Sequence, residues 1–336
     1  MLDVLIDHRG KTPKKLGGDF QPTGVPVVSA VNLKSGRILL PADARCVSDA
    51  MYRRWMPVPL LAGDVLLTSE APLGELARVP TDAPMVLGQR LFGLRGKEGV
   101  LDNGYLYYLL RWSPVRAQLT ARATGTTVSG IRQSELIRVA IPVPDLDIQT
   151  AIAEILGALD DKIDVNGRLA TIGESLALAR LEQTNARTAL STFADLGREQ
   201  VKPERFMNVE VDHFSLPAFD ASRLPDRCSG ETVRSNKFRL TGPTVLVSKL
   251  NPHIPRVWFA VPTEGVLALT STEFVVLNPK ANWSPALLWA ACAAPSFVKS
   301  LASRVTGTTG SHQRVRPQDV MEASVVDLTA LAIRRL

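Results

Sequence analysis

The sequence predicts a mixed α/β (α+β) fold in which two domains of related design are separated by one long helix. Its 336 residues correspond to about two domains, at a typical size of roughly 150 residues each. Residues beyond 145 have the apolar period of a helix, and short motifs on one side of this stretch recur on the other side in the same order. We therefore predict a first domain over 1–145, a spacer helix over 146–190 and a second domain over 191–328.

The spacer is predicted to be helical because its apolar side chains recur at steps of three or four residues, or at sums of these steps. These side chains are Ile148, Ile152, Ile155, Leu159, Ile163, Leu169, Ile172 and Leu176. No proline lies between Asp145 and Lys202, and Asp145 with Asp147 supplies an N-cap and negative charge in the first turn. A helix from Leu146 to about Thr188 would be roughly 60 Å long, at about 1.5 Å per residue.

Short aliphatic runs bounded by glycine and proline indicate strands in the first domain, and one longer apolar run indicates a helix. The predicted elements are a strand–turn–strand over 24–38, a short helix over 46–55, strands over 63–69 and 87–94, a helix over 105–123 with a break at Pro114, and a strand over 138–143.

Landmarks of the first domain recur in the second, which indicates a tandem duplication. The matching pairs are Val65–Thr68 with Val245–Ser248, Val143–Leu146 with Val325–Leu328, and the tetrapeptide TGTT at 124–127 with TGTT at 306–309. A match of four residues can arise by chance. The shared order of the landmarks is harder to explain in that way.

Charge and composition narrow the class of protein. The net charge is +6; residues 146–188 hold seven acids and four bases, which gives −3 and leaves +9 for the flanks. Basic flanks suit a polyanionic partner, although ordinary basic domains beside a solvated helix explain the same charges. The three cysteines form no CxxC motif, the N-terminus lacks an apolar signal run, and the apolar stretch 286–294 is too short to span a membrane. We therefore expect a cytoplasmic protein with no membrane partner and no metal site.

The sequence contains no motif that indicates an enzyme. Neither NPP nor DPP, the start of an adenine-methyltransferase motif, occurs, and no GxGxxG turn follows a predicted strand. Gly10-Lys11-Thr12 resembles the end of a phosphate loop, but Leu5 stands where its first glycine is required. The four histidines are scattered without ligand spacing. We predict no catalytic residue.

Several long blocks are similar to those of a known family. They are HRGKTPKKLGG (8–18), GVPVVSAVNLKSGRI (24–38), GDVLLTSEAPLGELA (63–77), LGQRLFGLR (87–95), the stretch from TGTT through the spacer (124–164), HFSLPAFDASRLP (213–225) and VLVSKLNPHIPRVWF (245–259). With these blocks the chain resembles the specificity subunit of type I restriction–modification systems over nearly its full length.

The resemblance implies two target-recognition domains, each reading one half of a bipartite site in double-stranded DNA. It also implies that the spacer would pair with a second conserved helix in an antiparallel coiled coil and recruit two modification subunits. These methyltransferase subunits carry S-adenosylmethionine, and restriction subunits with ATP and Mg²⁺ join them. The specificity subunit itself holds no cofactor and performs no chemistry.

One departure from the family pattern lies at the C-terminal end. The sequence stops at DLTALAIRRL, so residues 329–336 would be the start of a truncated second conserved helix. An alternative function is therefore a truncated, inactive copy that serves only as a protein-interaction scaffold.

DNA contacts need cations and hydroxyls for phosphates and planar polar groups for base edges. The candidates for phosphate contact are Lys11, Lys14 and Lys15, the repeated loops Thr124, Gly125, Thr126, Thr127 and Thr306, Gly307, Thr308, Thr309, and the following Arg132. The candidates for base reading are Asn32, Ser69, Glu70, Gln89 and Arg90 in the first domain, and Lys249, Asn251, His253 and Arg314 in the second. The alternative for the lysines is a solvated loop, and the alternative for Asn32 and Asn251 is a turn-forming role.

The spacer offers candidates for partner contact on its predicted surface. They are Gln149, Asp160, Asp161 and Lys162.

Overall fold

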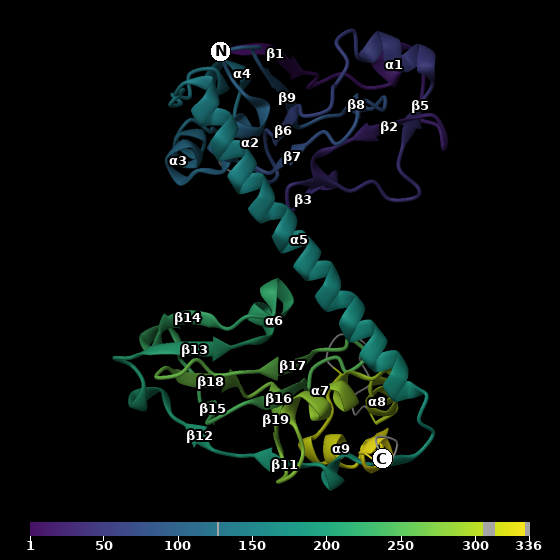
Figure 1. The fold of residues 1–336 in the computed structure, drawn as a ribbon, viewed down its shortest axis with the longest axis vertical. Coiled ribbons are helices and arrows are strands. Elements are labelled where there is room, and N and C mark those ends of the chain that lie inside the picture. The colour runs from purple at the N-terminus through teal and green to yellow at the C-terminus, as the bar shows by residue number, and fades with distance from the viewer. Residues whose placement is uncertain (126–127, 305–312, 333–336) are drawn as a thin grey trace. The chain divides into compact units, whose positions relative to one another are not determined.

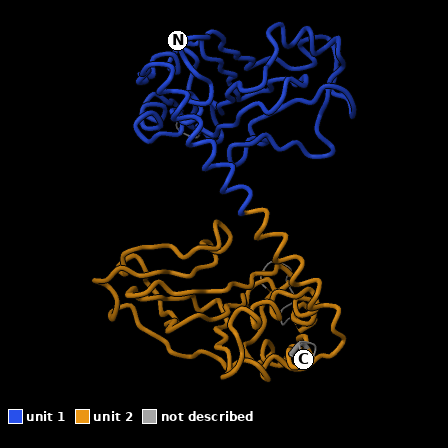
Figure 2. The backbone as a smooth tube through the Cα atoms, viewed as in Figure 1, with its two compact units in different colours: residues 1–166 blue, residues 167–336 orange. Residues whose placement is uncertain are grey.

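The computed structural model describes residues 1–125, 128–304 and 313–332. The chain forms two compact units, Met1–Asn166 and Gly167–Leu336, which Figure 2 shows in different colours. Helix α5 (Leu146–Glu182) begins in unit 1 and ends in unit 2, and Figure 1 shows it as one continuous helix. The prediction of mixed α/β domains with one long helix between them is confirmed.

Unit 1 is built on an antiparallel sheet of strand order β1-β9-β6-β7. Its strands are β1 (Leu2–Asp7), β9 (Leu91–Gly96), β6 (Val65–Thr68) and β7 (Leu76–Arg78). Helices α2 (Asn103–Arg111) and α3 (Ser113–Ala121) pack against this sheet (Figure 1), and α4 (Gln133–Leu136) follows them. Val65, Leu67 and Phe92 of the sheet share one buried core with Tyr105 and Leu109 of α2.

A smaller sheet of order β5-β2-β8 completes unit 1. The remaining elements are η1 (Lys14–Leu16), β2 (Val25–Val28), η2 (Ala30–Asn32), β3 (Leu33–Lys34), β4 (Arg37–Ile38), β5 (Cys46–Val47), α1 (Asp49–Trp55) and β8 (Val86–Leu87). Strands β2 and β8 run parallel, while β5 pairs antiparallel with β2. Val28 and Trp55 belong to a second core that also takes Leu66 from the main sheet, so the two sheets share a boundary of buried side chains.

Unit 2 is built on an antiparallel sheet of order β11-β19-β16-β17. Its strands are β11 (Ala194–Gly197), β19 (Phe274–Pro279), β16 (Thr244–Ser248) and β17 (Val257–Ala260). Helices α7 (Pro285–Ala293) and α8 (Pro295–Ala302) pack on it, and α9 (Pro317–Met321) and α10 (Thr329–Ala332) follow. Val245 and Leu277 of the sheet lie in one core with Leu288 and Phe297 of the helices.

A five-stranded sheet of order β12-β15-β18-β13-β14 completes unit 2, together with the pair β10-β20. The elements are β10 (Arg187–Ala189), η3 (Leu190–Thr192), β12 (Gln200–Val201), η4 (Pro203–Arg205), β13 (Glu210–Phe214), α6 (Leu216–Ser222), β14 (Asp226–Ser229), η5 (Gly230–Thr232), β15 (Lys237–Leu240), β18 (Leu267–Ser271) and β20 (Ser324–Val326). Strands β13 and β18 run parallel, as β2 and β8 do in unit 1.

The two units repeat one topology, as the motif order predicts. The sheet β1-β9-β6-β7 corresponds strand by strand to β11-β19-β16-β17. The trio β5-β2-β8 corresponds to β14-β13-β18, with the same parallel pair and the same antiparallel neighbour. Helices α2, α3 and α4 correspond in chain order to α7, α8 and α9. Strands β12 and β15 extend the second sheet of unit 2 alone.

Several predicted element bounds are wrong for local physical reasons. The predicted helix over 46–55 starts only at Asp49, because Ser48 Oγ accepts a hydrogen bond from Met51 N and caps it. The predicted strand over 87–94 divides into β8 and β9 around Arg90, whose φ of 66° is incompatible with a strand. Helix α5 ends at Glu182 rather than near Thr188, because 187–189 pairs with β20.

The predicted strand over 138–143 is also wrong. Its counterpart in unit 2, β20, is a strand because it pairs with β10. Residues 138–143 pair with no strand among the described residues and run as irregular chain into α5. The predicted domain limits at 145 and 190 stay predictions.

Among the described residues, no single helix is long and apolar enough to cross a membrane. Helices α7 and α8 reach that length and composition only when joined, and they bend by 61° where they meet. Both helices contribute buried side chains to the core of unit 2.

The first turns of α5 are attached to unit 1 by one buried amide side chain. Gln149 is 1% exposed. Its Oε1 accepts from Asp102 N at 3.0 Å, and its Nε2 donates to Val100 O at 3.0 Å and to Pro144 O at 2.7 Å. Gln149 thereby joins the start of α5 to the N-terminus of α2.

We expect Gln149→Ala to lower the free energy of unfolding by about 2–4 kcal/mol, because it removes three hydrogen bonds and leaves buried groups unpaired. Urea unfolding measures this change. Gln133→Ala, at an exposed glutamine of α4, is the matched control and should shift the unfolding free energy by less than about 0.5 kcal/mol. Equal effects of the two substitutions would contradict the assignment of Gln149 as a buried anchor.

A second buried polar group lies directly after β1. His8 is 7% exposed, and its Nδ1 has no hydrogen-bond partner among the described residues. Burial, with a smaller contribution from the nearby positive charge of Lys11, lowers the pKa of His8 to about 4. His8 is therefore neutral in the folded protein at neutral pH.

The depressed pKa of His8 predicts a loss of stability in mild acid. Unfolded histidine titrates near 6.5, so between about pH 6.5 and pH 4 the unfolded chain binds the extra proton. The free energy of unfolding should fall across this window by at most about 3 kcal/mol from this group. Urea unfolding at several pH values should show a flatter dependence for His8→Asn and an unchanged one for His253→Asn, at an exposed loop position. A dependence that His8→Asn leaves intact would refute the assignment.

Candidate nucleic-acid interface

Three loop segments of unit 1 meet at one end of its main sheet. They are 69–71 after β6, 88–90 before β9, and the described residues 124–125 and 128–131 between α3 and α4, and we call them the first loop cluster. Ser69 N donates to Arg90 O, and Ile131 N donates to Ser69 O, both at 2.9 Å. Thr124 and Gly130 exchange two hydrogen bonds, at 2.8 and 3.0 Å. The structure thus brings together four predicted contact residues from three separate segments: Ser69, Glu70, Arg90 and Thr124.

Unit 2 contains the same arrangement at the equivalent end of its sheet. Segments 249–251 after β16, 272–273 before β19 and 313–315 before α9 form the second loop cluster. Lys249 N donates to Glu273 O at 2.8 Å, and Val315 N donates to Lys249 O at 3.1 Å. These two bonds correspond to those of Ser69 in unit 1. Predicted contact residues Lys249, Asn251 and Arg314 therefore lie together.

The two clusters also share an unusual backbone turn. Ala71 has a φ of 53° and Asn251 a φ of 50°, and a proline follows each of them. Few residues other than glycine adopt this left-handed conformation, so its recurrence at equivalent positions shows that the loops, as well as the strands, are duplicated.

Each cluster carries one exposed arginine paired with a glutamate. Arg90 Nε lies 3.0 Å from Glu70 Oε1 in the first cluster, and Arg314 Nη2 lies 3.0 Å from Glu273 Oε1 in the second. The arginine side chains are 55% and 57% exposed. Both guanidinium groups are therefore accessible at the surface, which base or phosphate contact requires.

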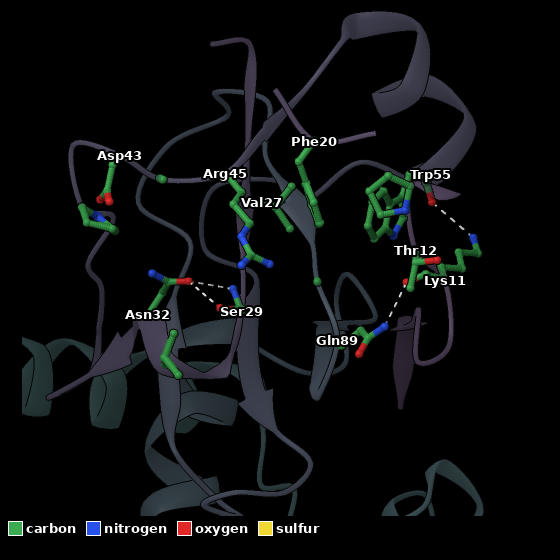
Figure 3. Close-up of a pocket in the computed structure, with 15 residues that line it drawn as sticks. Lys11, Thr12, Phe20, Val27, Ser29, Asn32, Asp43, Arg45, Trp55 and Gln89 are labelled. Atoms are coloured by element: carbon green, nitrogen blue, oxygen red, sulfur yellow. Dashed lines mark hydrogen bonds between the residues drawn. The ribbon is translucent and has the colours of Figure 1, made fainter. Parts of the chain in front are cut away.

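A pocket of about 610 Å³ lies beside the first loop cluster (Figure 3). The predicted residues Lys11, Asn32 and Gln89 line it. Gln89 belongs to both features, since it adjoins Arg90 and its Nε2 donates to Lys11 O at 3.4 Å. The pocket and the first loop cluster therefore form one continuous candidate surface.

Two further lining residues escaped sequence reasoning: Phe20 and Arg45. The guanidinium carbon of Arg45 lies 5.3 Å from the centre of the Phe20 ring, a distance that permits a cation–π contact. Phe20 and Arg45 are separated in sequence, and no motif links them. The pairing of β5 with β2 places Arg45 here, so no local signal was available.

Two of the three clustered lysines donate hydrogen bonds to backbone carbonyl groups of the same chain. Lys11 Nζ donates to Trp55 O at 3.2 Å, and Lys15 Nζ donates to Gly10 O at 2.8 Å. Lys14 is exposed on η1. Lys14 is therefore the clearest phosphate candidate of the three.

Asn32 has the geometry of a turn-forming residue. It is 8% exposed; its Oδ1 accepts from Ser29 N at 2.9 Å, and its Nδ2 donates to Leu39 O at 3.0 Å. These bonds support the turn interpretation over base reading, because the amide is already engaged on both sides.

Other candidates differ in how accessible they are. Ser69 is 1% exposed, and its Oγ has no hydrogen-bond partner among the described residues. Burial lowers the pKa of the Lys249 ammonium group, and Glu273 opposes that shift. His253 is exposed in the loop that follows the second cluster.

The repeated TGTT loops are described only in part. Gly125 has a φ of 119°, and a Cβ there would lie 2.2 Å from Val128 O, so the backbone requires glycine. Arg132 is exposed at the N-cap of α4. Six predicted contact residues lie outside the described residues: Thr126, Thr127, Thr306, Gly307, Thr308 and Thr309.

The predicted partner surface of α5 needs one correction. Gln149 is not on the surface, because its amide is buried among the backbone groups of residues 100–102 and 144. Asp160 Oδ2 accepts hydrogen bonds from Tyr108 Oη at 3.0 Å and Arg111 Nη1 at 2.9 Å. Asp161 and Lys162 are exposed.

Most of the predicted apolar stripe of α5 is also exposed. We call Ile148, Ile155, Leu159, Ile163, Leu169, Ile172 and Leu176 the α5 stripe; each is between 50% and 67% exposed. Ile152 instead packs on the core of unit 1. The part of the chain that the structure describes therefore does not cover this stripe.

In the described ranges, no three His, Cys, Asp or Glu side chains gather as a metal site requires. The expectation that S-adenosylmethionine, ATP and Mg²⁺ belong to partner subunits stays a prediction.

The chain is similar in sequence to known proteins. The family model for the type I restriction modification DNA specificity domain matches residues 3–172. The type I restriction enzyme MjaVIII specificity subunit of Methanocaldococcus jannaschii is 27% identical over 152 residues, which cover 44% of this chain and 36% of that protein. The putative MjaX specificity subunit of the same organism is 28% identical over 102 residues, covering 30% of this chain and 23% of that protein. The matches thus span about a third or less of these relatives.

A solved structure shows the same fold over a longer range. The crystal structure of the type I restriction-modification system S subunit from M. genitalium superposes with a TM-score of 0.55 at 15% sequence identity. The superposition covers 96% of this chain and 82% of that one. Since the family model covers half of the chain and includes the first loop cluster and most of α5, the chain belongs to the family of type I restriction-modification DNA specificity domains.

Proposed function

We propose that this chain is a sequence-specific DNA-binding specificity subunit, and that each unit reads one half of a bipartite duplex site. The observation that carries the proposal is the recurrence of one loop cluster, with an exposed arginine, in both units of a member of this family. Two readers built on the same backbone suit a target with two separate halves.

The residues of the interface suit two kinds of contact. Cations such as Lys14 attract phosphates without regard to sequence, while Gln89 and Arg90 have the planar donors that read base edges in the major groove. A bidentate contact discriminates against a wrong base by about 1–3 kcal/mol, so a few such contacts per half-site suffice.

Catalysis then belongs to other subunits. We propose that two modification subunits with methyltransferase activity bind along α5, and that restriction subunits join this assembly. The exposed α5 stripe supports the proposal, since contiguous exposed apolar side chains usually mark a protein interface. Pairing of α5 with another helix as an antiparallel coiled coil is compatible with the same stripe and stays a prediction. DNA as the target implies action in the cytoplasm.

The competing function is a scaffold that binds modification subunits but no longer reads DNA. The two are separated by selection from a library of duplexes with randomised sequence, using this chain together with its modification subunits. A specificity subunit enriches one motif with two fixed halves. A scaffold enriches no sequence, and that outcome would refute the proposed function.

Lys14→Ala should weaken DNA binding about equally for all duplexes, because a phosphate contact carries no sequence information. Measured across salt concentrations, the slope of log affinity against log salt should become shallower by about 0.9, the release of roughly one counterion. Lys97→Ala is the charge-matched control, since Lys97 is exposed at the opposite end of β9. Equal slopes for the two variants would argue against a contact at Lys14.

Ile172→Asp should reduce co-purification with modification subunits, because it places a charge in the α5 stripe. Ile172 is 64% exposed, so the unfolding free energy should change by less than about 1 kcal/mol. Ala170→Asp adds the same charge on another face of α5 and should leave co-purification unchanged. If both variants lose the partner equally, the stripe is not the docking face.

A further inference from the structure

We propose that Arg90 reads a guanine in one half-site and that Glu70 is the positioning residue that holds Arg90 ready to do so. This inference rests on the proposed function, because it assigns one base contact within it. It names the base that Arg90 contacts. It also gives a role to the negatively charged Glu70 on a surface that has to approach DNA, which is itself negatively charged.

The backbone of Arg90 is held in place from both sides. Its carbonyl accepts the hydrogen bond from Ser69 N, and strand β9 begins at the next residue. Its φ of 66° lies in the left-handed region, which a non-glycine residue adopts only when its surroundings require it. The backbone position from which the Arg90 side chain extends is therefore fixed.

The guanidinium group is oriented at one end and accessible at the other. Its Nε lies 3.0 Å from Glu70 Oε1, while neither terminal nitrogen hydrogen-bonds to another described residue. Two parallel terminal N–H donors match the O6 and N7 acceptors of guanine in the major groove. Because Glu70 engages Nε, the two terminal nitrogens of Arg90 remain available to donate to guanine.

Glu70 itself is kept near Arg90 by the loop cluster. It forms a backbone bridge with Gly130, and a Cβ on that glycine would lie 3.0 Å from Glu70 Cβ, so the third segment packs closely against it. The neighbouring cation Arg9 is already engaged, since it pairs with Asp7 and its Nη1 donates to Ile131 O at 3.1 Å. Arg9 therefore does not displace Arg90 from Glu70.

A carboxylate here has two opposite effects on DNA binding. It restricts the rotamers of Arg90, which lowers the entropy cost of ordering the side chain on a base. It also repels phosphate, which weakens binding to every sequence. A positioning role therefore predicts that removing the negative charge tightens binding to random DNA while discrimination at one base falls. A purely structural role predicts that both weaken.

Unit 2 shows the same chemical pair in a different position on the same backbone. Glu273 precedes β19 where Arg90 precedes β9, and Arg314 is bridged to Leu250 where Gly130 is bridged to Glu70. The guanidinium group thus comes from a different segment in each cluster. Substitutions at Glu70 and Arg90 should accordingly affect only one half of the target.

The test uses this chain in complex with its modification subunits and the duplex that the wild-type complex selects from a randomised library. Affinities are measured for that duplex, for each single-base substitution within it, and for a random duplex of equal length. The variants are Arg90→Lys and Glu70→Gln. The control is Glu199→Gln, which breaks the exposed pair of Glu199 with Arg239 in unit 2.

Arg90→Lys keeps the charge but loses the fork, so the preference for guanine at one position should fall by about 10- to 100-fold with the other positions unchanged. Glu70→Gln should lower the same preference about 5-fold or more and tighten binding to the random duplex. Glu199→Gln should change neither.

The outcomes separate the inference from the proposed function. If the wild-type complex selects no motif, the proposed function fails and the inference fails with it. If a motif is selected but Arg90→Lys keeps every preference, the assignment of Arg90 is overturned alone. If Glu70→Gln weakens all duplexes equally, Glu70 is structural and the positioning role is overturned. Because both side chains are exposed surface groups, urea unfolding should show wild-type stability for each variant.

Discussion

The pairing of β6 with β9 in unit 1, and of β16 with β19 in unit 2, is the constraint on which the candidate interface depends. The register places Thr68 opposite Leu91 and Ser248 opposite Phe274, so the residues just beyond these pairs must face each other as the strands end. Backbone hydrogen bonds from Ser69 and Lys249 extend this pairing into the loops and add a third segment to each cluster. The loops are therefore a continuation of the strand pairing.

The two loop clusters share one backbone arrangement and differ in their side chains. The left-handed turns at Ala71 and Asn251 and the bonds to Arg90 O and Glu273 O are the same in both clusters, while the side chains differ. The residue that precedes the strand even has the opposite charge: it is Arg90 before β9 and Glu273 before β19. Because these side chains are exposed, the same backbone accommodates different residues in the two units.

The N-terminal half of helix α5 is hydrogen-bonded to the rest of unit 1, while the α5 stripe is exposed. Gln149 and Asp160 bind it to unit 1 through hydrogen bonds, and burial raises the pKa of the Tyr108 hydroxyl to about 12, so this hydroxyl stays a donor to Asp160 at neutral pH. The α5 stripe has no cover among the described residues. Exposed aliphatic side chains along a helix favour association, so the α5 stripe is suited to contact with another protein surface.

The sequence by itself determined the class of fold, the duplication and the family. Helical period, motif order and long blocks are local or ordered signals, so α5, strands such as β2, β6 and β16, and the TGTT repeat were predictable. Only the tertiary structure decided which candidates meet: Ser69, Arg90 and Thr124 come together through backbone bonds between distant segments. It also decided which side chains are buried or paired. Gln149 is buried rather than on the surface, the Asn32 amide is hydrogen-bonded in a turn, and Phe20 contacts Arg45. The physical reason is that strand pairing and burial act between residues far apart in sequence, and no local pattern records either.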